Sequence, residues 1–152
     1  TMRKLNLLCG LLIGLLILSS CSNNDDSNSN SIIGVWKPVK EVDVCSTGSE
    51  QSSDYSACHQ QSRYTFNADG SLTIVDYQLE NGDCIITYNE NGVWQLNNDN
   101  LTITSGGETN NPTFFELTNN TLRVGYYDSD PNDPCDGGNL PSHYYTEFNR
   151  VE

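Results

Sequence analysis

From Ile32 onward the chain alternates apolar and polar residues in short segments, and turn residues separate the segments at intervals of about ten positions. A period of two places the apolar side chains of an extended strand on one face. After the first twenty residues, no window of helical length carries an apolar stripe with a period of 3.6 residues. The pattern predicts nine strands and no helix, at residues 34–44, 63–67, 72–77, 84–88, 93–96, 101–104, 113–117, 122–127 and 144–150.

The apolar members of this alternation are mostly large. Antiparallel strands with one apolar face each are what a closed meander needs. We therefore expect an all-β fold, an antiparallel up-and-down β-barrel of about 8–9 strands. Its expected core contains Trp36, Tyr64, Phe66, Leu72, Ile74, Ile86, Trp94, Leu96, Leu101, Ile103, Phe115, Leu117, Leu122, Val124, Tyr126, Tyr144 and Phe148.

The first twenty residues have the layout of an export signal. Arg3 and Lys4 are followed by an apolar run over residues 5–18 and then by Ser19 and Ser20. The run has about fourteen residues, whereas a membrane-spanning helix needs about twenty. Residues 18–21, Leu-Ser-Ser-Cys, resemble the lipobox of bacterial lipoproteins, which makes Cys21 the expected lipid acceptor. An ordinary cleaved signal followed by an incidental cysteine is the alternative.

Residues 21–31 contain only Ser, Asn and Asp after Cys21, and we interpret them as a flexible tether to a domain at 32–152. The expected location is the cell envelope, with a lipid anchor in the outer membrane. Asp25 and Asp26 resemble the acidic export signal of surface lipoproteins of Bacteroidetes, so the domain faces either the cell surface or the periplasm. A net charge of −13 leaves no basic patch for nucleic acid. We expect a monomer.

Four cysteines remain in the mature domain: Cys45, Cys58, Cys84 and Cys135. In an oxidising compartment they most simply form two disulfides, for which three connectivities exist. A zinc site is the alternative, although the sequence has no Cys-x-x-Cys motif.

In its order of motifs the chain resembles the lipocalin-like domains of Bacteroidetes lipoproteins. The resemblance rests on residues 33–36 (Ile-Gly-Val-Trp), 64–70 (Tyr-Thr-Phe-Asn-Ala-Asp-Gly), 92–96 (Gly-Val-Trp-Gln-Leu), 101–104 and 144–151. It implies an up-and-down barrel that encloses an apolar interior. It also implies that Cys58 pairs with Cys84, which leaves Cys45 for Cys135.

We expect the domain to bind a small apolar or amphipathic ligand in a modest apolar pocket, open at one end, that takes one acyl-like or aromatic group. Its expected walls are Ile74, Ile86, Ile103, Val124, Tyr126 and Tyr144. Trp36 is expected to plug the closed end, with a ligand contact as the alternative. The competing function is a surface interaction or inhibitor module whose barrel core is filled. We do not expect an enzyme, because His59 and His143 are expected to be solvated and no nucleophile motif accompanies them.

The segment 128–138 alternates oxygen-bearing side chains as calcium loops do. Asp128, Asp130 and Asp136 are the candidate calcium ligands. A solvated acidic loop is the alternative, and no other cofactor is expected.

Overall fold

Strands carry almost all of the regular structure in the computed structural model, which describes residues 31–128 and 137–151. One short 3-10 helix, η1 (His59–Gln61), interrupts them. The strands are β1 (Gly34–Val44), β2 (Glu50–Asp54), β3 (Arg63–Phe66), β4 (Ser71–Glu80), β5 (Asp83–Asn97), β6 (Asn100–Ser105), β7 (Glu108–Asn110), β8 (Phe114–Leu117), β9 (Thr121–Tyr127) and β10 (His143–Arg150).

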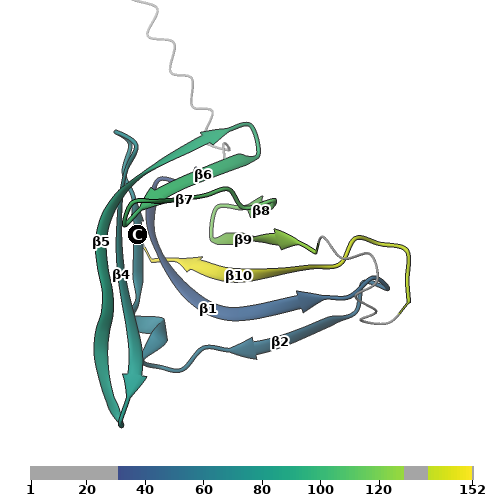
Figure 1. Cartoon of the computed structure of the whole chain (residues 1–152), viewed down its shortest axis with the longest axis horizontal. Helices are drawn as coiled ribbons and strands as arrows, with labels where there is room; N and C mark the ends of the chain where they lie inside the picture. Colours follow the sequence, from purple (N-terminus) through teal and green to yellow (C-terminus); the bar gives the residue numbers. More distant parts are fainter. Residues whose placement is uncertain (1–30, 129–136, 152) are drawn as a thin grey trace, which may run out of the picture.

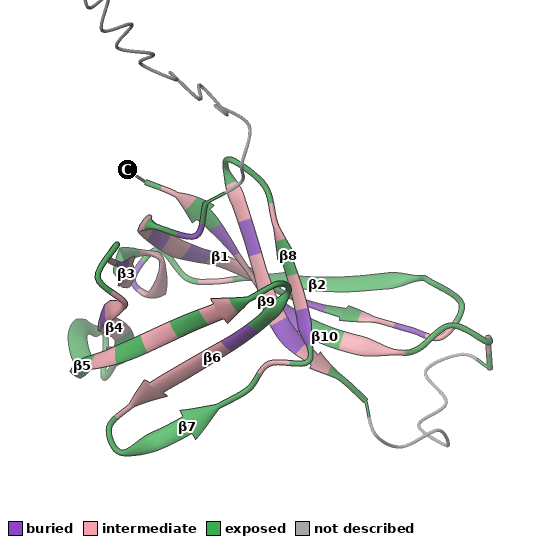
Figure 2. Ribbon diagram, turned by 90° about the horizontal axis from the view of Figure 1, so that it is seen from above, coloured by how far each residue is buried: buried purple, intermediate pink, exposed green. Residues whose placement is uncertain are grey.

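All strands belong to one antiparallel sheet in the order β7-β6-β5-β4-β3-β1-β10-β9-β8, with β2 paired to β1 beside this path. Most strands pair with their neighbours in the chain, and the pairing of β1 with β10 joins the two ends of the meander. The all-β, up-and-down fold is thereby confirmed. The sheet curls into a half-barrel (Figures 1 and 2) whose edge strands β7 and β8 are not paired with each other within the described residues.

Strand β1 turns the corner of the half-barrel. Its first part, from Gly34 to Trp36, pairs with β3, whereas the part from Lys40 to Val44 pairs with β2. The register against β10 shifts between Pro38 and Lys40. Proline has no N–H for the ladder, so a bulge at this point costs the sheet little hydrogen bonding.

Two predicted strands, 84–88 and 93–96, form one continuous strand, β5. The expected turn at Asn91-Gly92 is therefore wrong. Gly92 pairs with Leu72 on one side and with Ser105 on the other. A Cβ atom at this position would collide with the backbone oxygen of Thr104, so the glycine serves the close approach of β6 rather than a turn.

Sequence alternation missed three elements: β2, β7 and η1. β2 reads Glu-Gln-Ser-Ser-Asp and is exposed along its whole length, so it has no apolar face to reveal it. β7 has only three residues, all exposed, and pairs with β6. η1 is too short for a helical period.

The main core lies inside the curl, where Figure 2 shows buried segments meeting at the centre of the sheet. Most of the expected core belongs to it. The buried members are Ile32, Trp36, Phe66, Leu72, Ile74, Leu101, Leu122 and Phe148, and Tyr64, Trp94, Leu96, Ile103, Phe115, Leu117 and Val124 pack against them.

Three expected core residues lie elsewhere. Ile86 is exposed, because β5 is exposed on both faces from Asp83 to Asn91. The register between β4 and β5 also shifts at Asp76/Tyr77, which sets Ile86 opposite Tyr77 and off the face of Ile74. Tyr144 is exposed and Tyr126 half-buried, on strand ends that extend past the curl. A second buried cluster, Val42, Phe114 and Tyr145, occupies the opposite face of those extended strands.

Candidate ligand pocket

An apolar pocket of about 150 Å³ opens inside the curl. Seven side chains from β3, β6, β9 and β10 line it: Tyr64, Phe66, Ile103, Leu122, Val124, Thr146 and Phe148. These strands lie far apart along the sheet, and the curl sets β6 across from β9 and β10. The pocket is therefore a product of the curvature and not of any single hairpin.

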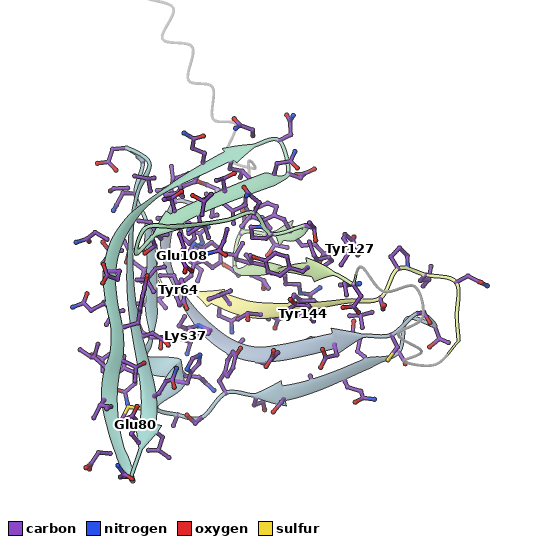
Figure 3. All side chains as sticks on the ribbon, in the orientation of Figure 1. Lys37, Tyr64, Glu80, Glu108, Tyr127 and Tyr144 are labelled. Atoms are coloured by element: carbon purple, nitrogen blue, oxygen red, sulfur yellow. A yellow bond between two sulfur atoms is a disulfide. The ribbon has the colours of Figure 1, made fainter. Side chains whose placement is uncertain are left out.

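Aromatic rings hold the pocket walls in place. Tyr64 meets Phe148 edge to face, with ring centroids 5.0 Å apart. Behind the wall, Phe66 meets Trp94 at 5.7 Å, and the Trp94 indole N–H donates to the Asn67 carbonyl. Edge-to-face contacts of this kind favour one ring orientation. Figure 3 shows Tyr64 in the angle between the β4–β5 hairpin and the strands β1 and β10.

Trp36 fills the closed end of the half-barrel. It has no exposed surface, and its indole Nε1 donates to the Ile32 carbonyl at 2.7 Å. The Arg150 guanidinium lies 4.2 Å from the centre of the Trp36 rings and donates to the carbonyls of Asn119 and Ile33. Trp36 is thus a plug, as expected, and it does not line the pocket.

A polar rim borders the pocket on the side of η1. The Tyr55 hydroxyl lies 3.3 Å from Oγ1 of Thr146, which also lines the pocket. The ring of Tyr55 stands 4.2 Å from the His59 ring. His59 Nδ1 donates to the Tyr77 carbonyl and lies 3.7 Å from Asp76 Oδ1. This rim joins the β4–β5 hairpin to β10 across the mouth.

Asp76 also holds the rim to the sheet. The Ser62 hydroxyl donates to Asp76 Oδ1 at 2.7 Å and accepts the backbone N–H of Tyr77. Ser62 is fully buried at the start of β3. Burial raises the pKa of Tyr64, and the negative charge of Asp76 raises it further.

The protein thus has an apolar pocket inside a curled antiparallel meander whose closed end is filled by a tryptophan. Residues 32–124 match the family model of the lipocalin-like domain. The chain belongs to the lipocalin-like domain family. The match begins at the buried Ile32 and ends within β9, so it covers all of the pocket except the side chains from β10. Comparison with curated protein sequences gave no match.

Two of the expected pocket residues of this lipocalin-like domain, Ile103 and Val124, line the pocket. Ile74 is buried in the adjoining core, and Ile86 lies exposed on the other face of β5. The rings of Tyr126 and Tyr144 contact each other, with centroids 5.8 Å apart, farther out along β9 and β10. The structure thus brings together only part of the expected set.

Sequence reasoning placed four other lining residues in the core but did not assign them to the pocket: Tyr64, Phe66, Leu122 and Phe148. It missed Thr146 altogether. Thr146 lies two residues from Phe148 on β10 and therefore shares its face. The alternation along β10 could therefore have placed Thr146 on the inner face. The core prediction omits Thr146 because it includes only apolar and aromatic residues.

Cys58 and Cys84 form a disulfide, as the resemblance implied, with Cα atoms 5.5 Å apart. The disulfide links the segment before η1 to the start of β5, and it thereby holds η1, which carries His59 of the rim. Cys45 is buried and disulfide-bonded. Its expected partner Cys135 lies outside the described residues, so that pairing stays a prediction. Cys21 also lies outside them.

The expected calcium loop is described only in part. Asp128 is exposed, and its backbone N–H donates to the Ser142 carbonyl. Asp130 and Asp136 lie outside the described residues, so the calcium hypothesis stays a prediction. Among the residues that the structure does describe, no group of three or more His, Cys, Asp or Glu side chains is arranged to hold a metal ion.

The two histidines are less solvated than the sequence suggested, since both are half-buried. His59 belongs to the polar rim. His143 stacks on Phe114 at 4.4 Å, on the opposite face of the sheet from the pocket. Residues 31–128 and 137–151 contain no helix long and apolar enough to cross a membrane.

Proposed function

We propose that this lipocalin-like domain binds one small apolar group, a short acyl segment or an aromatic ring, in the pocket between β3, β6, β9 and β10. The observation that carries the proposal is the lining, in which five of the seven side chains, Phe66, Ile103, Leu122, Val124 and Phe148, end in hydrocarbon. A dry apolar cavity of about 150 Å³ accommodates a benzene ring. Each buried methylene contributes about 0.8 kcal/mol to binding, so a ligand of this size binds weakly.

The test uses the chain from residue 22 onward, exported with an ordinary secretory signal so that its disulfides form. Toluene, an uncharged probe with a single aromatic ring, is titrated into the protein, and its binding is followed by saturation-transfer NMR. We expect saturable binding. Ile103→Trp places an indole in the pocket and is expected to abolish binding. Val93→Trp is the matched control, because Val93 is 54% exposed on the outward side of the neighbouring strand.

A folded wild type that does not bind the probe would instead support an interaction module that uses its outer surface. If Ile103→Trp does not fold, Val124→Phe is the smaller change that still narrows the same pocket. Equal binding by wild type and by a folded pocket variant would place the probe elsewhere on the protein.

We further propose that the domain is held at the cell envelope by a lipid on Cys21. The support is sequence alone: the basic start, the apolar run and the small residues before Cys21. Cys21→Ser is expected to release the protein from the membrane fraction and to remove acyl mass from the N-terminal peptide. Full membrane retention of that variant would contradict the proposal.

A further inference from the structure

The mouth of the pocket is built from tyrosines and carboxylates. Tyr55 is half-buried at the rim, with its hydroxyl 3.3 Å from Oγ1 of Thr146 and its ring centroid 4.2 Å from that of His59. Tyr64 forms the adjoining wall of the pocket. Tyrosine rings with accessible faces attract organic cations through the ring quadrupole.

Two carboxylates act on these rings: Asp76 acts on both Tyr55 and Tyr64, and Glu41 acts on Tyr55. Glu41 pairs with Thr146 across β1 and β10 and therefore lies on the pocket face. Asp76 follows the inward-facing Ile74 by two positions on β4. Burial raises the pKa of Tyr55, and the negative charges of Glu41 and Asp76 raise it further. Both carboxylates therefore act on Tyr55, whose hydroxyl contacts Thr146, the strand partner of Glu41.

More negative charge follows on the same face. Asp43 pairs with Tyr144 at the outer end of β1, and Glu90 pairs with Ile74 on β5. Both side chains are exposed. The concave face thus carries carboxylates on both sides of the pocket mouth.

The lysines and arginines of the described residues do not neutralise this face. By strand alternation Lys37, Lys40, Arg63 and Arg123 lie on the other face, next to inward residues such as Trp36 and Tyr64. Lys40 and Arg123 both contact Glu147 there. Arg150 points inward, but it lies at the closed end and is occupied by Trp36 and backbone carbonyls.

One polar group in the pocket wall faces solvent, since no buried side-chain nitrogen or oxygen of the described residues lacks a partner. Among the described residues, the Tyr64 hydroxyl makes no hydrogen bond, although Tyr64 is half-buried and lines the pocket. A phenol oxygen accepts a hydrogen bond from an ammonium N–H as well as from water. The hydroxyl and the charge of Asp76 therefore favour the same kind of ligand group.

We propose that the ligand is cationic at one end: an apolar or aromatic group enters the pocket, and an ammonium group rests at the mouth between Tyr55, Tyr64, Glu41 and Asp76. This inference rests on the proposed function and names the ligand class for the same pocket. The carboxylates favour the ammonium group by charge, and the apolar walls of the pocket favour a hydrocarbon group attached to that ammonium.

The experiment compares benzylammonium, benzyl alcohol and benzoate, which share one ring and differ in charge. Each is titrated at physiological ionic strength against the full chain in nanodiscs of zwitterionic lipid, with saturation-transfer NMR as the readout and empty nanodiscs as the blank. We expect benzylammonium to bind about tenfold more tightly than benzoate, with benzyl alcohol between them.

The carboxylates are then neutralised. Glu41→Gln combined with Asp76→Asn keeps the oxygen that accepts from Ser62 and is expected to bring benzylammonium to the affinity of benzyl alcohol. Glu80→Gln combined with Asp83→Asn is the control, because it removes the same two charges from the exposed tip of the β4–β5 hairpin, where Glu80 lies far from Tyr64 in Figure 3. It is expected to keep the preference for the cation.

Equal binding of benzylammonium and benzoate overturns the inference. An equal loss of preference in the control Glu80→Gln with Asp83→Asn also overturns it, because that result would indicate only the overall negative charge. If Asp76→Asn does not fold, an unchanged preference in the exposed Glu41→Gln variant overturns it as well. Binding of benzyl alcohol with no preference for the cation leaves the proposed function standing. No binding by any of the three ligands contradicts both.

Discussion

The two ends of the half-barrel both combine aromatic rings with polar groups, and they differ in how completely those polar groups are hydrogen-bonded. At the closed end, the indole N–H of Trp36 has a carbonyl partner and the guanidinium of Arg150 donates to several carbonyls. At the mouth, Tyr64 has an unpartnered hydroxyl among the described residues, and Tyr55 has one long contact of 3.3 Å. The closed end stabilises the fold, whereas the mouth keeps hydrogen-bonding and packing capacity for a ligand.

Removing the plug should have the largest effect on stability. Trp36→Ala deletes a side chain with no exposed surface and leaves a cavity, so we expect the free energy of unfolding to fall by about 3–5 kcal/mol. Trp94→Ala, at a half-buried indole, should cost less. Urea denaturation followed by far-UV circular dichroism measures both. Equal losses would show that the closed end is not the more tightly packed region.

Removing the Cys58–Cys84 disulfide should come next. Cys58 and Cys84 are separated by 26 residues, and the chain-entropy model gives a crosslink of this length about 3–4 kcal/mol. Cys58→Ala with Cys84→Ala is therefore expected to lower the melting temperature strongly and to weaken probe binding, because η1 carries the rim. Unchanged probe affinity in the folded variant would separate the rim from the pocket.

Substitution of Arg150 should destabilise the closed end by a smaller amount. Arg150→Met keeps much of the stem and removes both the contact with Trp36 and the hydrogen bonds to Asn119 and Ile33. We expect a loss of about 1–2 kcal/mol, without an effect on probe binding. Arg150→Lys keeps the charge but not the planar fork, and it should recover only part of the loss. A change in probe affinity would contradict the separation of the two ends.

Tyr64→Phe should have the smallest effect on stability at neutral pH, within about 0.5 kcal/mol, because no hydrogen bond is lost among the described residues. Its effect should appear in alkali. The pKa of Tyr64 is raised in the folded protein, so the stability linked to it is present below the unfolded value of about 10 and is lost as the pH rises above that value. Denaturation at a series of pH values from about 8 to 11 should show a shallower decline for Tyr64→Phe.

Regular alternation explains why the sequence predicted the strands around the core so well. β3, β6 and β9 each carry apolar residues at every second position, β10 does so except at Thr146, and the expected bounds of all four strands lie within one or two residues of the observed ones. The pocket set was predicted less well. Strict alternation along β5 predicts that Ile86 faces the pocket. A single register shift between β4 and β5 places Ile86 on the opposite face of the sheet.

By itself the sequence determined an antiparallel all-β meander, the residues of its inner face and, through family resemblance, the Cys58–Cys84 pair. These features follow from local period-two patterning and from motif order, which need no knowledge of distant contacts. Only the tertiary structure decided which inner residues line an open pocket and which plug it. Curvature sets Ile103 across from Val124, and the bulge at Pro38 turns β1 from β3 toward β2. Such non-local geometry depends on how all strands pack together, so no single stretch of the chain encodes it.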